Sequence, residues 1–201
     1  AEVVTLTRLP VLAQQIHPLA EDTDALIYQA VRSTLCWEGR PFVHYNVRLQ
    51  SYGPVKPWEV MRHGGWKHPA TWRRWLRAYR QAMLERARQV RQLRAWIDQE
   101  QLPVIVSGDF NSTPDQWFYG HLARGLRAAG RLGGVVAPSW PSTRPLVRID
   151  HVLVSPEWEV LEGDVPATRL SDHRPVIARL RWRPALAYAK TCSTDAPIAY
   201  P

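Results

Sequence analysis

Apolar and polar residues alternate along residues 41–50. Because successive side chains of a β-strand point to opposite faces, a period of two predicts a strand with one face toward the core and one polar face. The core face would hold Val43, Tyr45, Val47 and Leu49, and the polar face Phe42, His44, Asn46 and Arg48.

A longer period, of three and four residues, follows along residues 70–101. Its apolar positions are Trp72, Trp75, Leu76, Tyr79, Met83, Ala87, Val90, Leu93 and Ile97. This spacing predicts a long amphipathic helix. Eight arginines against three acidic residues fill the other positions, a pattern that is typical of a solvated helix face.

Shorter apolar runs predict the remaining strands. They are residues 3–6, stopped by Pro10, and residues 103–107, 146–155 and 175–182. Residues 25–35 carry a mixed apolar pattern that leads to a turn at 38–40. We expect residues 51–69, rich in Gly and Pro, to form a loop. The length of 201 residues suits one domain, here residues 1–184, and residues 185–201 lack periodicity and are expected to form a loosely ordered tail.

The net charge of +8, almost all of it from arginine, narrows the choice of partners. Arginine pairs with phosphate oxygens through two parallel N–H groups, so the charge favours a phosphate-ester substrate, nucleic acid or an acidic membrane surface. A bias toward arginine over lysine is the alternative explanation. No apolar run reaches the roughly 18 residues of a membrane span, and Cys36 and Cys192 lack zinc-site spacing. Compartment and oligomeric state stay open.

Three short segments place acidic, amide and imidazole groups at the ends or beginnings of predicted strands. They are Ser-Gly-Asp-Phe-Asn at 107–111, Arg-Ile-Asp-His at 148–151 and Ser-Asp-His-Arg-Pro at 171–175. A sheet can bring such residues together in one cleft. Oxygen ligands of this kind suit Mg²⁺ or Mn²⁺. The alternative is that Asp109 and Asn111 cap a following helix and that Asp172 pairs with Arg174.

The order GDFN, IDH and SDHRP resembles the endonuclease/exonuclease/phosphatase superfamily, whose members share the fold of pancreatic deoxyribonuclease. The resemblance spans about residues 3–182 and implies an α+β fold, a four-layer α/β/β/α sandwich of two packed mixed sheets. It also implies a metal-dependent phosphoesterase that uses Mg²⁺ or Mn²⁺. Ser139-Trp140-Pro141 is similar to the loop that precedes the IDH strand in this family.

The resemblance implies a role for each matching residue. His173 would contact the scissile phosphate, with Asp150 accepting its other N–H. Asp109 would activate the attacking water, and Asn111 would donate a hydrogen bond to a phosphate oxygen. Asp172 would bind or orient the metal.

The chain departs from the family pattern in two places. Where the family often carries Asn-Thr-His-Leu, the chain reads Asn-Val-Arg-Leu at 46–49. Asn46 keeps the amide, and Arg48 could neutralise a phosphate oxygen but could not act as a general acid. The family's opening strands and its metal-binding glutamate have no match, so we expect the sandwich to be incomplete at the N-terminus.

The leading hypothesis is therefore a phosphodiesterase or nuclease that uses a metal-assisted activated water. One alternative is a phospholipid or sugar-phosphate phosphoesterase at a membrane surface, which the arginines and tryptophans would also suit. Another is a non-catalytic phosphate-binding domain with a degenerate site, which Arg48 and the unmatched glutamate would favour.

Overall fold

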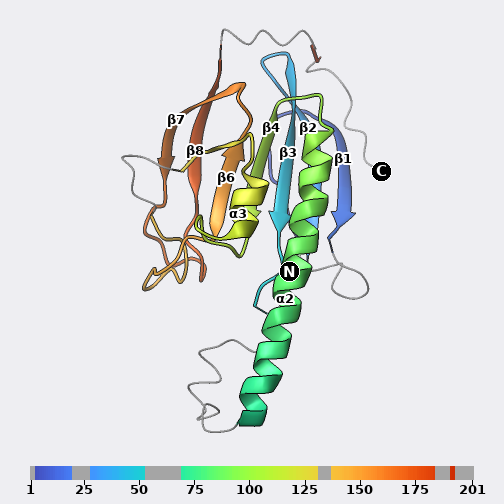
Figure 1. Ribbon diagram of the computed structural model, residues 1–201. Helices are drawn as coiled ribbons and strands as arrows, with labels where there is room; N and C mark the ends of the chain where they lie inside the picture. The colour runs from blue at the N-terminus through green and yellow to red at the C-terminus, as the bar shows by residue number, and fades with distance from the viewer. Residues whose placement is uncertain (1–2, 20–27, 53–68, 131–136, 184–190, 193–201) are drawn as a thin grey trace.

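A computed structural model describes residues 3–19, 28–52, 69–130, 137–183 and 191–192 (Figure 1). Its larger sheet has six strands in the order β1-β2-β3-β4-β6-β5, and β7 and β8 form a second, two-stranded sheet. The strands are β1 (Val11–Pro18), β2 (Gln29–Trp37), β3 (Arg40–Arg48), β4 (Val104–Asp109), β5 (Arg127–Ala128), β6 (Asp150–Val154), β7 (Trp158–Asp164) and β8 (Ile177–Trp182). The helices are α2 (Pro69–Asp98) and α3 (Trp117–Leu122).

The predicted turn joins β2 to β3. Glu38 and Gly39 form a two-residue connection in which both have positive φ, 51° and 73°. A turn of this hand matches the twist of the strands it joins, and glycine adopts it without steric cost. The hairpin is antiparallel, with Trp37 opposite Arg40, so the predicted strand along residues 41–50 is confirmed.

Strand register aligns three charged residues at one edge of the larger sheet. β3 pairs with β4 in parallel, with Arg48 opposite Asp109, and β4 pairs with β6 antiparallel, with Asp109 opposite Asp150. Gly108 permits this close pairing, because its φ is 138° and a Cβ there would overlap the carbonyl oxygen of Val47. Residues from three distant segments therefore meet at this edge.

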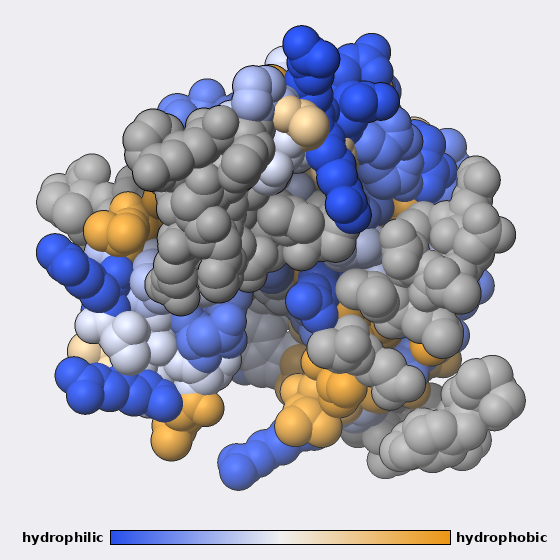
Figure 2. Space-filling model, turned by 90° about the horizontal axis from the view of Figure 1, so that it is seen from below, coloured by the Kyte–Doolittle hydropathy of each residue, from blue (hydrophilic) through white to orange (hydrophobic). Residues whose placement is uncertain are grey.

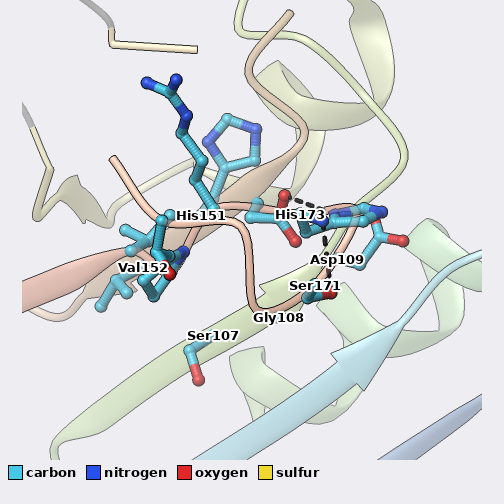
Figure 3. A pocket seen from close by; sticks show the side chains of 12 residues that line it. Ser107, Gly108, Asp109, His151, Val152, Ser171 and His173 are labelled. Atoms are coloured by element: carbon cyan, nitrogen blue, oxygen red, sulfur yellow. Dashed lines mark hydrogen bonds and ion pairs between the residues drawn. The ribbon is translucent and has the colours of Figure 1, made fainter. Parts of the chain in front are cut away.

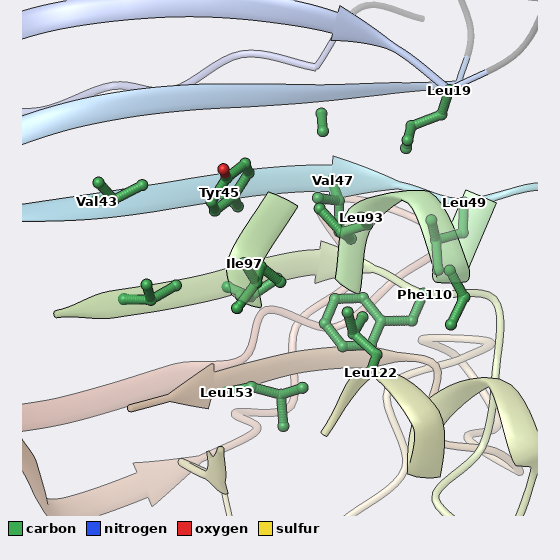
Figure 4. Packing of buried hydrophobic residues seen from close by; sticks show 14 residues of the cluster. Leu19, Val43, Tyr45, Val47, Leu49, Leu93, Ile97, Phe110, Leu122 and Leu153 are labelled. Atoms are coloured by element: carbon green, nitrogen blue, oxygen red, sulfur yellow. The ribbon is translucent and has the colours of Figure 1, made fainter. Parts of the chain in front are cut away.

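Helix α2 packs its apolar stripe against the larger sheet (Figure 4). Val90, Leu93 and Ile97 are almost fully buried among the core-facing side chains of β3 and β4. The long amphipathic helix predicted from the sequence is confirmed, and its N-terminal part extends beyond the sheet (Figure 1). Only the C-terminal part of the helix thus contributes to the core.

A second core lies between the two sheets. Phe42 of β3 meets the ring of Trp158 edge-on at 5.1 Å, and Trp158 stacks on Trp182 at 3.9 Å. Because Phe42 is buried here, the face of β3 predicted to be polar is apolar at this end. The α+β fold with two packed sheets is confirmed, with α2 and α3 covering the outer face of the larger sheet. The described residues include no helix over the outer face of β7 and β8.

The first strand was predicted in the wrong place. Residues 3–6 form no strand, and Leu6 is 92% exposed. The strand that pairs with β2 is β1, whose sequence VLAQQIHP is rich in polar residues. β1 lies at the edge of the sheet, where pairing with a single neighbour and exposure to water weaken the apolar signal.

The arginine face of α2 is not entirely solvated, which corrects the sequence interpretation. Arg86 is fully buried and Arg94 nearly so. Arg86 Nε donates to the carbonyl oxygen of Gln50 at 2.6 Å, and Arg94 donates to the carbonyl oxygens of Leu122 and Arg124. These arginines satisfy buried carbonyl groups, a use that helical periodicity cannot reveal.

A disulfide joins Cys36, at the end of β2, to Cys192. The backbone N–H of Cys192 also donates to the carbonyl oxygen of Gly39 at 2.9 Å. Two cysteines 156 residues apart gave no signal of pairing in the sequence. The bond fixes residues 191–192 of the predicted tail against the hairpin; the rest of that tail, and residues 53–68 of the predicted loop, lie outside the described residues. Within the described parts of the chain, no helix has the length and apolar character needed to cross a membrane.

Candidate active site

The three motif segments meet where β3 and β4 end and β6 begins. They border two adjoining cavities of about 390 and 530 Å³. Asp109 and His173 line both cavities; Asp150 lines the smaller one, and Arg48 and Asp172 line the larger. Figure 3 shows the smaller cavity, with Asp109 and His173 on its lining. The structure therefore brings together residues that the sequence separates by more than one hundred positions.

His173 and Asp150 form a hydrogen-bonded pair. The distance from His173 Nδ1 to Asp150 Oδ2 is 2.8 Å. This hydrogen bond raises the pKa of His173, while burial opposes the shift. Because Nδ1 is bound to the carboxylate, the proton-donating or phosphate-facing atom of the ring is Nε2. The arrangement matches the orientation that the resemblance implied for this pair.

Asp109 carries an unusually basic carboxylate. Its burial, and secondly the negative charge of Asp150, raise its pKa to about 6. Two hydrogen bonds of 2.9 Å from Asn111, one from the backbone N–H and one from the side-chain amide, hold the carboxylate oxygens in place. A carboxylate with a pKa near 6 is well suited to accept a proton at neutral pH.

The side-chain amide of Asn111 has hydrogen-bond partners other than the phosphate oxygen that the resemblance implied. Its amide Nδ2 donates to Asp109 Oδ2 and to the carbonyl oxygen of Leu49, both at 2.9 Å. Both N–H groups of the amide are thus engaged within the protein. Its φ of 48° lies in the left-handed region, which asparagine tolerates better than most residues. The geometry makes Asn111 the residue that positions Asp109.

Asp109, Asp150 and His173 each offer a ligand atom within 4.8 Å of the others. The two carboxylates fit a divalent cation, whose charge would offset the repulsion from Asp150 that, after burial, raises the pKa of Asp109. Asp172 was the predicted metal residue. Its side chain is 80% exposed, and its carboxylate lies 4.0 Å from His173 Nε2, outside this cluster.

Of the two residues predicted to bind phosphate, only Arg48 lines the cavity. Arg48 lines the larger cavity together with Asp109 and His173. Asn46 lies on the same face of β3, but its amide donates to the carbonyl oxygen of Val4 and to Thr5 Oγ1. The geometry supports a phosphate contact by Arg48 and gives none for Asn46.

The resemblance also implied a metal-binding glutamate that the sequence did not match. Among the glutamates of the first forty residues, the structure describes Glu38, which lies in the β2–β3 turn. Glu2 and Glu21 lie outside the described residues.

Ser139 is a supporting residue for which the sequence analysis gave no role. It is fully buried, and its hydroxyl oxygen accepts the backbone N–H groups of Ile149 and Asp150 at 3.1 and 3.2 Å. Its carbonyl oxygen accepts the N–H of Arg174. Ser139 thus ties the start of β6 to the segment that carries His173. The Ser-Trp-Pro sequence was the available signal.

The chain belongs to the endonuclease/exonuclease/phosphatase family, whose model matches residues 2–173. This finding confirms the resemblance drawn from the three motifs. Comparison with curated protein sequences yields no match.

Solved structures share the fold at low sequence identity. A mannosyl-6-phosphatase of Bacteroides thetaiotaomicron is 16% identical, with a TM-score of 0.59 over 87% of this chain and 67% of its own. The catalytic domain of human Nocturnin is 20% identical, with a TM-score of 0.59 over 88% and 61%. Sphingomyelinase C from Streptomyces griseocarneus is 19% identical, with a TM-score of 0.52 over 86% and 65%. The chain spans about two thirds of the length of these structures.

Proposed function

We propose that the chain carries the catalytic centre of a divalent-metal-dependent phosphodiesterase. The observation that carries this proposal is the cluster of Asp109, Asp150 and His173, in which two carboxylates converge and one of them has a pKa raised to about 6. Family membership supports a hydrolase that acts on phosphate esters. The names of the mannosyl-6-phosphatase and the sphingomyelinase C indicate different substrates. The substrate of this protein is therefore argued from its own residues.

In the proposed reaction, Asp109 accepts a proton from the attacking water, and the water oxygen forms a bond to phosphorus as the ester P–O bond breaks. His173, held by Asp150 through Nδ1, donates from Nε2 to a non-bridging phosphate oxygen or to the leaving oxygen. Arg48 adds a positive charge on the same side of the cavity.

A divalent cation held by Asp109 and Asp150 would supply charge neutralisation for the phosphate. Asn111 and Ser139 position these groups and contact no substrate in this scheme. Asp172 borders the cavity and could orient a water of the cation.

The test is hydrolysis of bis-p-nitrophenyl phosphate with Mg²⁺ or Mn²⁺. Asp109→Asn and His173→Ala are expected to lower turnover at least about a hundredfold. Asp164→Asn is the matched control, because Asp164 is exposed on β7 and lines neither cavity. Turnover that survives both site variants, or that is unaffected by removal of the metal, would contradict the proposal.

A non-catalytic phosphate-binding domain is the second candidate, favoured by Arg48 in place of the family's histidine. It predicts phosphate-ester binding that Arg48→Ala abolishes, with no turnover under any metal. The same assay therefore separates the two candidates.

A further inference from the structure

The larger cavity extends from the catalytic groups to a wall of aromatic side chains. Besides Asp109 and His173, its lining includes Tyr52, Trp75 and Tyr79. Trp75 and Tyr79 come from α2, and Tyr52 comes from the segment that follows β3. The phosphodiesterase chemistry proposed above makes no use of these three rings, which we name the aromatic wall.

The rings of the aromatic wall lie nearly parallel. Tyr52 and Tyr79 stack with centroids 5.7 Å apart and an interplanar angle of 10°, and Trp75 and Tyr79 stack at 5.3 Å and 25°. Rings in this arrangement continue one another's stacking direction and can extend to a further planar group. A flat heteroaromatic ligand fits such a wall better than a flexible chain does.

Buried contacts hold the wall in place. The backbone of Gln50 donates to Gln89 Oε1 at 2.7 Å and accepts from Arg86 Nε at 2.6 Å, which fixes the chain two residues before Tyr52. The Arg86 guanidinium also lies 5.4 Å from the Tyr52 ring centroid, a cation–π contact. The wall is therefore built before any ligand arrives.

The part of α2 that carries Trp75 and Tyr79 is also rich in arginine. Arg73, Arg74, Arg77 and Arg80 are all exposed on the part of α2 that extends beyond the sheet (Figure 1). Seen from below, the molecule is hollowed near its middle, and both hydrophilic and hydrophobic side chains border the hollow (Figure 2). At about 100° per residue these four arginines lie on the side of the helix away from Trp75 and Tyr79, and none of them lines the cavity. They attract a polyanion to this end of the molecule, and Arg48 is the arginine inside the cavity.

We infer that the aromatic wall is a stacking subsite for an unpaired nucleobase next to the scissile phosphate. The inference rests on the proposed function for the position of that phosphate. Stacking on aromatic side chains beside a basic groove is the general way in which proteins hold single-stranded nucleic acid. The substrate is accordingly a single-stranded nucleic acid, with the base on the wall and the scissile phosphate beside Asp109, His173 and Arg48.

A phospholipid fits the described lining less well. An acyl chain needs an apolar groove that continues away from the phosphate site, whereas Ser51, Thr113 and Arg48 interrupt the aromatic surface of this cavity. Lipid binding is nevertheless a distinct outcome of the test.

The test compares two single strands of equal charge, hexathymidylate and an abasic hexamer with the same phosphates. Fluorescence anisotropy with metal omitted measures binding without turnover. The 201-residue chain is expected to bind the thymidylate about tenfold more tightly, which is about 1.4 kcal/mol and is of the size that stacking of one base on an aromatic side chain contributes. Equal affinity for the two strands would overturn the inference without any variant being needed.

Variants locate the discrimination. Trp75→Ala and Tyr79→Ala are expected to remove most of the preference for thymidylate, and Trp75→Phe, which keeps a ring, should retain most of it. Trp117→Ala is the matched control, because Trp117 is 49% exposed on α3 and does not line the cavity. A preference that survives both alanine variants in folded protein, as judged by circular dichroism, would place base recognition elsewhere and contradict the inference.

Two further arms separate the alternatives. Vesicles of phosphatidylcholine with phosphatidylglycerol should bind equally to wild type and Trp75→Ala; binding that depends on Trp75, with no base preference, would assign the wall to lipid instead. If the wild type prefers thymidylate but hydrolyses no phosphodiester with Mg²⁺ or Mn²⁺, the proposed function is rejected and the stacking subsite is retained. If the wild type hydrolyses the diester but binds both strands equally, the stacking subsite is rejected and the proposed function is retained.

Discussion

Two clusters of charged side chains in this protein have opposite electrostatic character. In the first, which we call the Glu100 cluster, Arg32 binds Glu100 through two hydrogen bonds of 2.7 and 2.9 Å, and the Tyr45 hydroxyl donates to the same carboxylate at 2.6 Å. In the second, the Asp109 cluster, the carboxylates of Asp109 and Asp150 and the imidazole of His173 lie within 4.8 Å of one another, and Asp150 alone is hydrogen-bonded to the imidazole. One cluster balances its charges and the other concentrates negative charge.

The pKa shifts of the two carboxylates show the consequence. Burial alone would raise the pKa of Glu100, but the hydrogen bonds from Arg32 and Tyr45 outweigh it and lower the pKa. Burial and Asp150 together raise the pKa of Asp109 to about 6. The Glu100 cluster therefore stabilises the fold by joining the segment that follows α2 to β2 and β3. The Asp109 cluster costs stability and is ready to bind a cation or a proton.

The largest expected effect separates the clusters by activity. His173→Ala should lower turnover of bis-p-nitrophenyl phosphate at least about a hundredfold, because in the proposed reaction the ring donates a proton to the phosphate. Glu100→Gln should leave turnover per folded molecule unchanged. Steady-state rates, normalised to the folded fraction from circular dichroism, check both. A comparable loss of turnover in the two variants would abolish the distinction.

The free energy of unfolding should depend more on the Glu100 cluster than on the Asp109 cluster. Glu100→Gln leaves the guanidinium of Arg32, whose side chain is only 20% exposed, without a charged partner. The free energy of unfolding should fall by about 2 kcal/mol, as for a broken hydrogen bond to a charged group. Urea titration measures this, and Glu159→Gln is the control because its partner Arg181 is 59% exposed. An equal fall in the free energy of unfolding in the two variants would show that the Glu100 cluster stabilises the fold no more than an exposed ion pair does.

A smaller effect of opposite sign is expected at Asp109. Asp109→Asn removes the repulsion from Asp150, so in metal-free buffer at pH 7.5 the free energy of unfolding should rise by about 1 kcal/mol while activity is lost. The same urea titration checks this gain. Destabilisation by the substitution would mean that the hydrogen bonds from Asn111 outweigh the repulsion.

The contributions of Glu100 and Asp109 to the free energy of unfolding should also depend on pH in opposite directions. The contribution of Glu100, whose folded-state pKa is lowered from 4.5, is present above that value and is lost as the pH falls through the lowered folded-state pKa. The contribution of Asp109, whose pKa is raised from 3.8 to about 6, is full below 3.8 and is lost as the pH rises to 6. Unfolding of the metal-free variants at pH 3–7 measures both. Parallel pH curves would contradict the comparison.

The sequence predicted the Asp109 cluster better than the Glu100 cluster for a physical reason. Asp109, Asp150 and His173 lie in short motifs at strand ends, where sheet topology determines their meeting point. Arg32 and Glu100 lie 68 residues apart with no motif around either. Their pairing depends on the angle at which α2 crosses the sheet, which periodicity does not encode.

Other elements followed the same division. Periodicity located α2 and β3 because regularly spaced apolar residues in each of them pack in the core that the helix and the larger sheet share. It failed for the edge strand β1 and for the buried Arg86, because strand pairing and hydrogen bonding to buried carbonyls determine those positions. The contact of Cys36 with Cys192 likewise depends on tertiary placement.

The most direct test of the central claim is the effect of Mn²⁺ on stability. If the Asp109 cluster binds a divalent cation, the free energy of unfolding of the wild type should rise with Mn²⁺, by about 2.7 kcal/mol at one hundred times the dissociation constant. The gain should disappear in the Asp109→Asn/Asp150→Asn double variant and persist in Glu100→Gln. An equal gain in the double variant, or none in the wild type, would contradict the account.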